Sequence, residues 1–170
     1  PRRGAREQRG QGLVNVLVIG RGNVGSALAR ESKKAGFRVT LAQARKSTLS
    51  SSRADLVLLA ARENALPELA LRVRALALPT RSVVALVSGS ADLEVLRPIA
   101  LSGVSTGRIH PIVSFVSRSV SPSLAGAFGL VEGNARAKRT LTEFAKALGL
   151  VPVTHATLAG NPKYHAALSI

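Results

Sequence analysis

Three glycines near the start of the chain have a spacing that suits a phosphate-bearing ligand. The segment runs Gly20-Arg21-Gly22-Asn23-Val24-Gly25, a G-x-G-x-x-G pattern. The first glycine permits a tight turn, the second lets the backbone approach a pyrophosphate, and the third lets a helix pack closely on a strand. A helix that begins here also directs free N–H groups toward the phosphates. The pattern predicts a dinucleotide-binding loop, and a domain of this shape that has lost its nucleotide is the alternative.

The choice of dinucleotide depends on residues about 20 positions further on. NAD-binding sites usually place Asp or Glu there, to bind the ribose 2′-hydroxyl. Residues 41–47 read LAQARKS and contain no acid. Arg45, Lys46 and Ser47 could instead bind a 2′-phosphate through charge-assisted hydrogen bonds. This favours NADP(H) over NAD(H), while a solvent-exposed basic loop is the alternative that needs no ligand.

Further candidates follow predicted strands, at the edge where doubly wound sheets bind ligands. The imidazole of His110 has an ordinary pKa close to neutral pH, which suits proton exchange with a substrate oxygen. Ser88 could hydrogen-bond the substrate or the cofactor amide, and Ala61 and Arg62 would lie beside ribose and pyrophosphate. The alternatives are that His110 anchors the next loop, that Ser88 ends an ordinary turn, and that Arg62 is simply exposed.

These candidates require strands and helices that alternate along the chain. Apolar runs predict strands at 13–19, 37–41, 56–60, 82–87, 105–110, 127–131 and 150–153. Helices are predicted over 23–35, over 64–76 with Asn64 as its cap, from Asp92 onward, and over 135–148. Pro111 is expected to stop the fifth strand. The alternation implies an α/β fold, a doubly wound and mostly parallel Rossmann-like sheet.

The same reading divides the chain into three parts. Residues 1–12 carry four arginines among Gly and Gln, and predict a flexible basic tail. Residues 13–160 form the predicted dinucleotide-binding domain. Asn161-Pro162 has the composition of a helix start, so residues 161–170 are expected to begin a C-terminal helix of a truncated or missing helical domain.

Composition narrows the possible functions. The chain has 170 residues, a net charge of +15 and no cysteine, which excludes disulfides, thiolate zinc sites and cysteine nucleophiles. Its three histidines are dispersed, so no metal site is predicted, and no Gly-x-Ser-x-Gly elbow supports a hydrolase.

The positive charge favours anionic partners. Only 3% of residues are aromatic and no nucleic-acid-reading motif is recognised, so nucleic acid is the last choice among them. The sequence contains neither a membrane-spanning run nor the apolar centre of a secretion signal, which predicts a cytoplasmic protein without membrane contact.

The order of these motifs resembles a Rossmann-like family in which a dinucleotide-binding fold precedes a helical domain of unknown function. That family is related to pyrroline-carboxylate reductases, hydroxyacid dehydrogenases and prephenate dehydrogenases. The similar segments are VLVIGRGNVGSALA, ADLVLLAAREN, VSGSA, GRIHPIVSF, GLVEGN and YHAALS. Prephenate dehydrogenases also have a His-Pro pair at a similar place, which implies that His110 bonds the substrate hydroxyl.

The chain departs from that family at three places. Ala61-Arg62-Glu63 stands where a Val-Pro-Asp-like turn is usual, and Leu86 stands where a histidine is common. The tyrosine-histidine motif at Tyr164-His165 usually opens a long helical domain, and here five residues follow it. In related dehydrogenases that domain completes the substrate pocket and often the dimer. The resemblance therefore implies that this chain alone is a poor catalyst, and a second copy or a partner chain could complete the cleft.

Together these features predict an NADP(H)-binding Rossmann-like domain of an oxidoreductase that acts on a small polar substrate. Whether the chain is itself an enzyme stays open. The alternative is a non-catalytic protein that uses the same fold to sense a nucleotide or to serve as a scaffold.

Overall fold

The computed structural model describes residues 15–45 and 53–155. The predictions for the basic tail at 1–12, for the beginning of the first strand at 13 and 14, for Lys46 and Ser47, and for the helix start at 161–170 lie outside these described residues.

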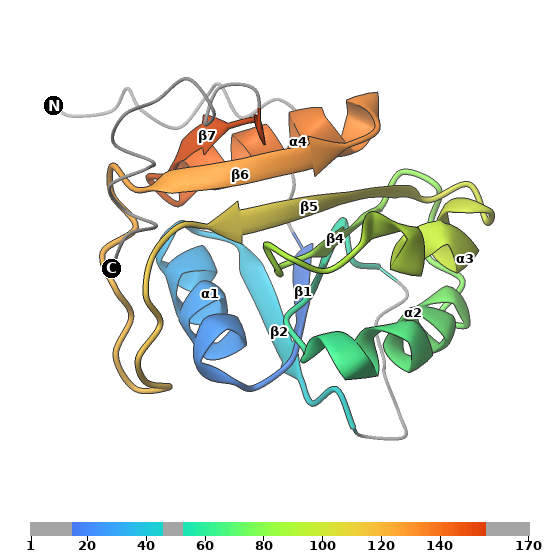
Figure 1. Cartoon of the computed structure of the whole chain (residues 1–170), viewed down its shortest axis with the longest axis horizontal. Helices are drawn as coiled ribbons and strands as arrows, with labels where there is room; N and C mark the ends of the chain where they lie inside the picture. The colour runs from blue at the N-terminus through green and yellow to red at the C-terminus, as the bar shows by residue number, and fades with distance from the viewer. Residues whose placement is uncertain (1–14, 46–52, 156–170) are drawn as a thin grey trace, which may run out of the picture.

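One sheet of seven strands organises the described part of the chain (Figure 1). Its order is β2-β1-β3-β4-β5-β6-β7. Strands β1 to β5 run parallel, β6 is antiparallel to β5, and β7 is parallel to β6. The bounds are β1 Asn15–Ile19, β2 Arg38–Ala42, β3 Leu56–Leu59, β4 Val83–Leu86, β5 Ser105–Pro111, β6 Phe128–Gly133 and β7 Val151–Val153. The predicted α/β fold with a mostly parallel, doubly wound sheet is confirmed.

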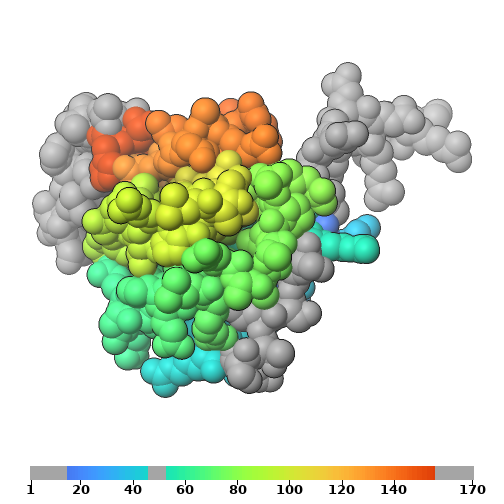
Figure 2. Space-filling model, turned by 90° about the vertical axis from the view of Figure 1, so that its right-hand side faces the viewer, coloured from blue at the N-terminus to red at the C-terminus, as the bar shows by residue number. Residues whose placement is uncertain are grey.

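Helices cover both faces of the sheet. One face carries α1 (Asn23–Lys34) and α4 (Ala135–Ala147), and the other carries α2 (Leu66–Arg74) and α3 (Arg97–Ala100) with the short 3₁₀ turns η1 (Glu63–Ala65) and η2 (Leu93–Leu96). Figure 2 shows α2 in green beside the yellow-green segment around α3, with α4 in orange on the far side of that segment. Because β3 and β4 are covered on both faces, every residue of LVLL and VVAL is buried.

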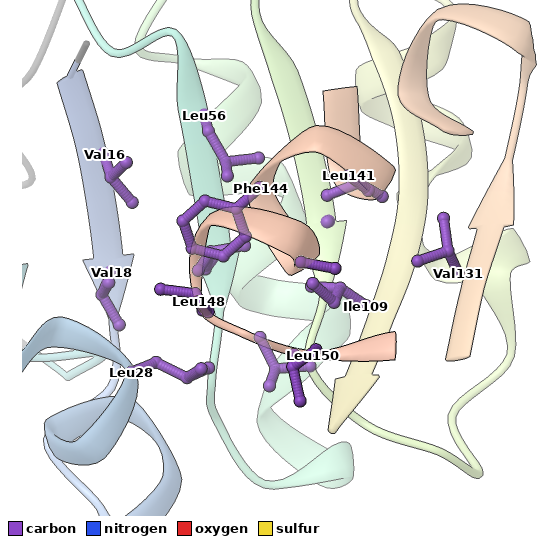
Figure 3. Close-up of a cluster of buried hydrophobic side chains, with 14 of the residues drawn as sticks. Val16, Val18, Leu28, Leu56, Ile109, Val131, Leu141, Phe144, Leu148 and Leu150 are labelled. Carbon is purple, nitrogen blue, oxygen red and sulfur yellow. The ribbon is translucent and has the colours of Figure 1, made fainter. Parts of the chain in front are cut away.

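Aliphatic side chains supply almost the whole core, as the composition predicts. Phe144 of α4 is 1% exposed and faces the β1 and β3 side chains Val16 and Leu56 (Figure 3). Its ring also contacts Phe37, with 5.4 Å between ring centroids. Leu28 of α1 belongs to the same cluster, so α1 and α4 share one apolar layer beneath the sheet.

The predicted helix from Asn64 to Leu76 is wrong at both ends. Glu63–Ala65 forms a 3₁₀ turn, and α2 begins only at Leu66, with Ala65 at the N-cap position and no capping side chain. The 3₁₀ turn therefore leads directly into α2. Pro67 occupies the first turn of α2, where its missing N–H costs no hydrogen bond. The helix ends at Arg74 because Ala77 adopts φ +47°, which a helix cannot contain.

The expectation that Pro111 stops the fifth strand is also wrong. Pro111 lies opposite Gly129 of β6, and the next residue, Ile112, donates its N–H to the Phe128 carbonyl at 2.8 Å. In an antiparallel pair only alternate residues exchange backbone hydrogen bonds. Pro111 occupies a position that exchanges none with β6, so its missing N–H does not interrupt the strand.

The strand order creates a switch point between β1 and β3. The chain leaves β1 toward β2 on one side and later returns to β3 on the other, and ligands of doubly wound sheets bind outside the carboxyl ends of two such strands. Gly20 directly follows β1 and Ala60 directly follows β3. The fold thus brings the glycine loop and the predicted residues after the third strand to the same edge of the sheet.

Candidate functional site

The first and third glycines of the loop are required by the backbone around them. Gly20 has φ +129°, and a Cβ there would lie 2.1 Å from the carbonyl oxygen of Ala60. A Cβ on Gly25, in the first turn of α1, would lie 2.0 Å from the carbonyl oxygen of Gly20. These two glycines let β1, β3 and α1 meet at van der Waals distance, which are the structural roles that the motif predicts for them.

Gly22 differs, because the fold itself does not need it. The residue is exposed and occupies the N-cap position of α1 with φ −72° and ψ −174°, and a Cβ there would have nothing within 4 Å. The first N–H groups of α1 have no acceptor inside the helix. Open space therefore faces a helix N-terminus at the switch point, which fits the pyrophosphate of a dinucleotide.

The side chain of Asn23 holds the segment that follows His110. Its amide nitrogen donates to the Phe115 carbonyl at 2.9 Å. Further along α1, Arg30 donates to the hydroxyl of Ser121 at 3.0 Å and to the carbonyl of Arg118. Figure 1 shows this long connection between β5 and β6 passing beside α1.

Of the other residues of the glycine motif, Arg21 is exposed and Val24 packs against the core.

Arg45 is the one member of the predicted 2′-phosphate set that the structure describes. It is exposed, and it follows Ala42, whose carbonyl accepts a hydrogen bond from the Gly20 N–H at 2.9 Å. Arg72 of α2 donates to the Ala44 carbonyl and so fixes the backbone just before Arg45. The end of β2 is thus tied to the glycine loop on one side and to α2 on the other.

A carboxylate that sequence analysis did not select lies at the ends of β3 and β4. Ser88 donates its hydroxyl to Glu63 at 3.0 Å, and Ser90 donates to the same carboxylate oxygen. Both hydrogen bonds lower the pKa of Glu63, and the bond from Ser90 has the larger effect. The Ser88 hydroxyl also accepts the N–H of Ala91 at 3.1 Å. The predicted residue Ser88 therefore already orders its own turn and the Glu63 side chain, while Ala61 is half-buried and Arg62 is exposed nearby.

The ring of His110 lies directly against Gly89. A Cβ at Gly89 would lie 2.9 Å from both Cδ2 and Nε2 of the imidazole. Burial lowers the pKa of His110 most, a hydrogen bond with the Val87 backbone raises it, and the charge of Arg108 lowers it, so the pKa lies below its usual value near 6.5. At neutral pH the imidazole is uncharged and can accept a proton. Gly89 is needed here because it alone leaves room for the ring.

This lowered pKa predicts a pH dependence of stability. The unfolded state binds a proton at His110 more readily than the folded state, so the free energy of unfolding falls as the pH drops below about 6.5. Urea unfolding at several pH values between 7.5 and 5 should show a shallower decline in His110→Asn than in the parent chain. Equal slopes in the two proteins would contradict the lowered pKa.

Arg108 is a second residue that sequence analysis missed. Its side chain is 8% exposed, and its Nε lies 3.1 Å from Oε2 of Glu132, the residue opposite it on β6. Its guanidinium also donates to the carbonyls of Gly89 and Ala91. Nε2 of the exposed His155 lies 3.2 Å from the other oxygen of Glu132.

The described residues also bear on metal binding and on membrane spanning. Residues 15–45 and 53–155 bring no three His, Asp or Glu side chains together as metal ligands. Within the same ranges, no helix has both the length and the apolar character needed to cross a membrane.

Comparison with known proteins shows what class of fold this is. No family model matches the chain, and no curated protein matches it either. Solved structures do match, and those reported below are Rossmann dehydrogenases or oxidoreductases. The chain therefore has a Rossmann-like fold, which confirms the fold that the sequence resemblance implies.

Three structures illustrate the likeness. A Bacteroides fragilis protein provisionally assigned as an NADP oxidoreductase has TM-score 0.70 and 16% identity, over 92% of this chain and 66% of its own. Prephenate dehydrogenase from A. aeolicus, in complex with hydroxyphenyl propionate and NAD+, has TM-score 0.66 and 15% identity, over 84% and 59%. (S)-3-hydroxybutyryl-CoA dehydrogenase from Ralstonia eutropha has TM-score 0.64 and 14% identity, over 84% and 63%. The chain thus spans less than two thirds of the length of these proteins.

Proposed function

We propose that this chain is the NADP(H)-binding domain of an oxidoreductase that acts on a small polar substrate. The observation that carries the proposal is the open space at Gly22, before the N-terminus of α1 and at the switch point of the sheet. Proteins of the same fold support it, since one is described as an NADP oxidoreductase and another was solved with NAD+.

Different residues would bind different parts of the dinucleotide. The backbone from Gly20 to Gly25 and the first turn of α1 would hold the pyrophosphate. Arg45, with Lys46 and Ser47, would bind the 2′-phosphate, while Ala61 and Arg62 would line the adjoining ribose. A bound nicotinamide dinucleotide supplies hydride transfer. The chain contributes binding and orientation, together with the groups that hold or move a proton.

The proton would move through His110. Because its imidazole is uncharged at neutral pH, it would accept the proton of a substrate hydroxyl as that substrate is oxidised, and return it in the reverse direction. Ser88, on the neighbouring strand end, would hydrogen-bond the substrate, with Glu63 fixing the direction of its hydroxyl. A second copy or a partner chain would supply the opposite wall of the cleft.

Calorimetric titration with NADPH and NADH tests the cofactor assignment. Pairing of a 2′-phosphate with Arg45 should contribute about 1.5–3 kcal/mol, roughly tenfold or more in affinity for NADPH over NADH. Arg45→Ala should remove most of that preference. Arg38→Ala is the matched control, because Arg38 is exposed at the start of β2, whereas Arg45 follows the end of that strand.

The outcomes separate the parts of the proposal. Equal affinity of the parent chain for NADPH and NADH would reject the 2′-phosphate site alone. No affinity for either dinucleotide at millimolar concentration would reject the proposed function. A titration with tripolyphosphate distinguishes specific binding from attraction of any polyanion to a chain of charge +15.

A further inference from the structure

Arg108 is a buried cation for which the dinucleotide site has no direct use. It lies on β5, two residues before His110, and side chains two residues apart on a strand share a face. The loop that ends β4, residues 88–91, turns over this face. Both side chains therefore lie beneath the same loop, Arg108 against its carbonyls and His110 against Gly89.

The contacts of Arg108 require the shape of a guanidinium. Its two terminal nitrogens donate to the Gly89 and Ala91 carbonyls, while Nε lies 3.1 Å from the Glu132 carboxylate as an ion pair without a hydrogen bond. A guanidinium offers five N–H donors in a rigid plane, whereas an ammonium is a compact charge on a flexible stem. A buried charge is costly unless it is paired, and Glu132 provides that pairing from the facing position on β6.

The loop that Arg108 holds is the loop that borders His110. With its carbonyls directed inward to Arg108, the backbone at Gly89 lies against one side of the imidazole. The same loop carries Ser88 and Ser90, which bind Glu63. A shift of residues 88–91 would thus move the support of His110 and both hydroxyl contacts of Glu63 together.

We propose that Arg108 is a positioning residue, which clamps residues 88–91 onto β5 and thereby fixes the orientation of the His110 ring in the substrate end of the site. The catalytic meaning of this orientation rests on the proposed function, but the clamp itself is a property of the chain without ligand. The charged group that acts on His110 is Arg108 on its own strand. Arg108 is in turn paired with Glu132 on β6, which also contacts His155, and its charge acts on Glu63 in η1 as well.

Nuclear magnetic resonance of the histidine rings tests the clamp directly. The chain has three histidines, so His155→Gln and His165→Gln assign the His110 signals. The parent chain should show a strong nuclear Overhauser effect between the Hδ2 proton of His110 and the Hα protons of Gly89. Arg108→Lys keeps the charge but loses the planar donor set, and Arg108→Gln loses both. Each should abolish that effect, and Arg108→Gln should also raise the pKa of His110.

Arg97→Gln is the matched control, because Arg97 is exposed on α3 and its replacement removes the same charge elsewhere. The amide signals of β1 and β3 should stay unchanged in every variant. An undiminished Overhauser effect in both Arg108 variants would overturn the proposal. Failure of Arg108→Lys to fold would overturn it too, because Arg108 would then determine the fold and not the ring orientation.

The test of the Arg108 clamp can succeed or fail independently of the proposed function. Arg108→Lys should bind NADPH within about twofold of the parent chain, since the glycine loop follows β1 and does not touch Arg108. A parent chain that binds no dinucleotide, but whose His110 contact with Gly89 depends on Arg108, would reject the function and keep the clamp.

Discussion

Replacing Gly22 with valine should abolish dinucleotide binding and leave the folded chain unchanged. The backbone at Gly22 has φ −72° and ψ −174°, a region that β-branched residues accept, and a Cβ there meets no atom of the protein within 4 Å. A bound pyrophosphate would occupy the space that the valine takes. Loss of two charged hydrogen bonds of about 1.5–3 kcal/mol each corresponds to roughly a hundredfold or greater loss of affinity.

Calorimetry with NADPH and thermal unfolding of the same samples measure the two parts of this expectation. Gly22→Ala, with its smaller side chain, should weaken binding by an intermediate amount. Binding of NADPH to Gly22→Val within tenfold of the parent affinity would show that the ligand does not approach this residue.

Replacing Gly25 with alanine should, unlike Gly22→Val, lower the stability of the fold even without a ligand. The new methyl group would lie 2.0 Å from the Gly20 carbonyl oxygen and 3.2 Å from Cβ of Ala60. Relief requires α1 to move away from β1, because the nearest atom belongs to the backbone. Overpacking of this kind costs about 1–3 kcal/mol or more, which exceeds the gain of about 1 kcal/mol from exchanging glycine for alanine within a helix.

Urea unfolding of Gly25→Ala should therefore show a net loss of about 2 kcal/mol, because a 2.0 Å contact with a backbone oxygen puts the overpacking cost near about 3 kcal/mol, against a gain of about 1 kcal/mol. Gly22→Ala is the matched control, since it adds the same methyl group three residues earlier where nothing lies within 4 Å, and its effect should stay below about 1 kcal/mol. Equal stability of the two variants would show that α1 is free to shift on the sheet.

The features that could be predicted from sequence depend on residues close together in the chain. The glycine spacing and the apolar runs are local, so the turn from β1 into α1 at Gly20 to Gly25 and the alternation of strands and helices were predicted correctly. The end of the fifth strand was not, because the tolerance of Pro111 depends on which residues of β5 exchange hydrogen bonds with β6. That pairing belongs to the sheet and not to the local sequence.

The polar contacts of the site were missed for the same reason. Glu63 meets Ser88 across 25 positions, and Arg108 meets Glu132 only because the register of β5 and β6 places them opposite one another. One signal was present in each segment. Glu63 comes four residues after the end of the buried strand β3, and Arg108 breaks an otherwise uncharged strand two residues before a candidate base. Neither signal predicts which residue Glu63 or Arg108 contacts in the fold.

The hydrogen bond from Asn23 to Phe115 joins two residues that are 92 positions apart and closes the chain between them into a ring. One end of that ring is the first turn of α1, and the other follows the strand that carries His110. Local opening of the connection between β5 and β6 would release both ends together. In hydrogen exchange, the amides of the first turn of α1 and those that follow His110 should therefore behave as one cooperative unit, even though β3 and β4 separate β1 from β5 in the sheet.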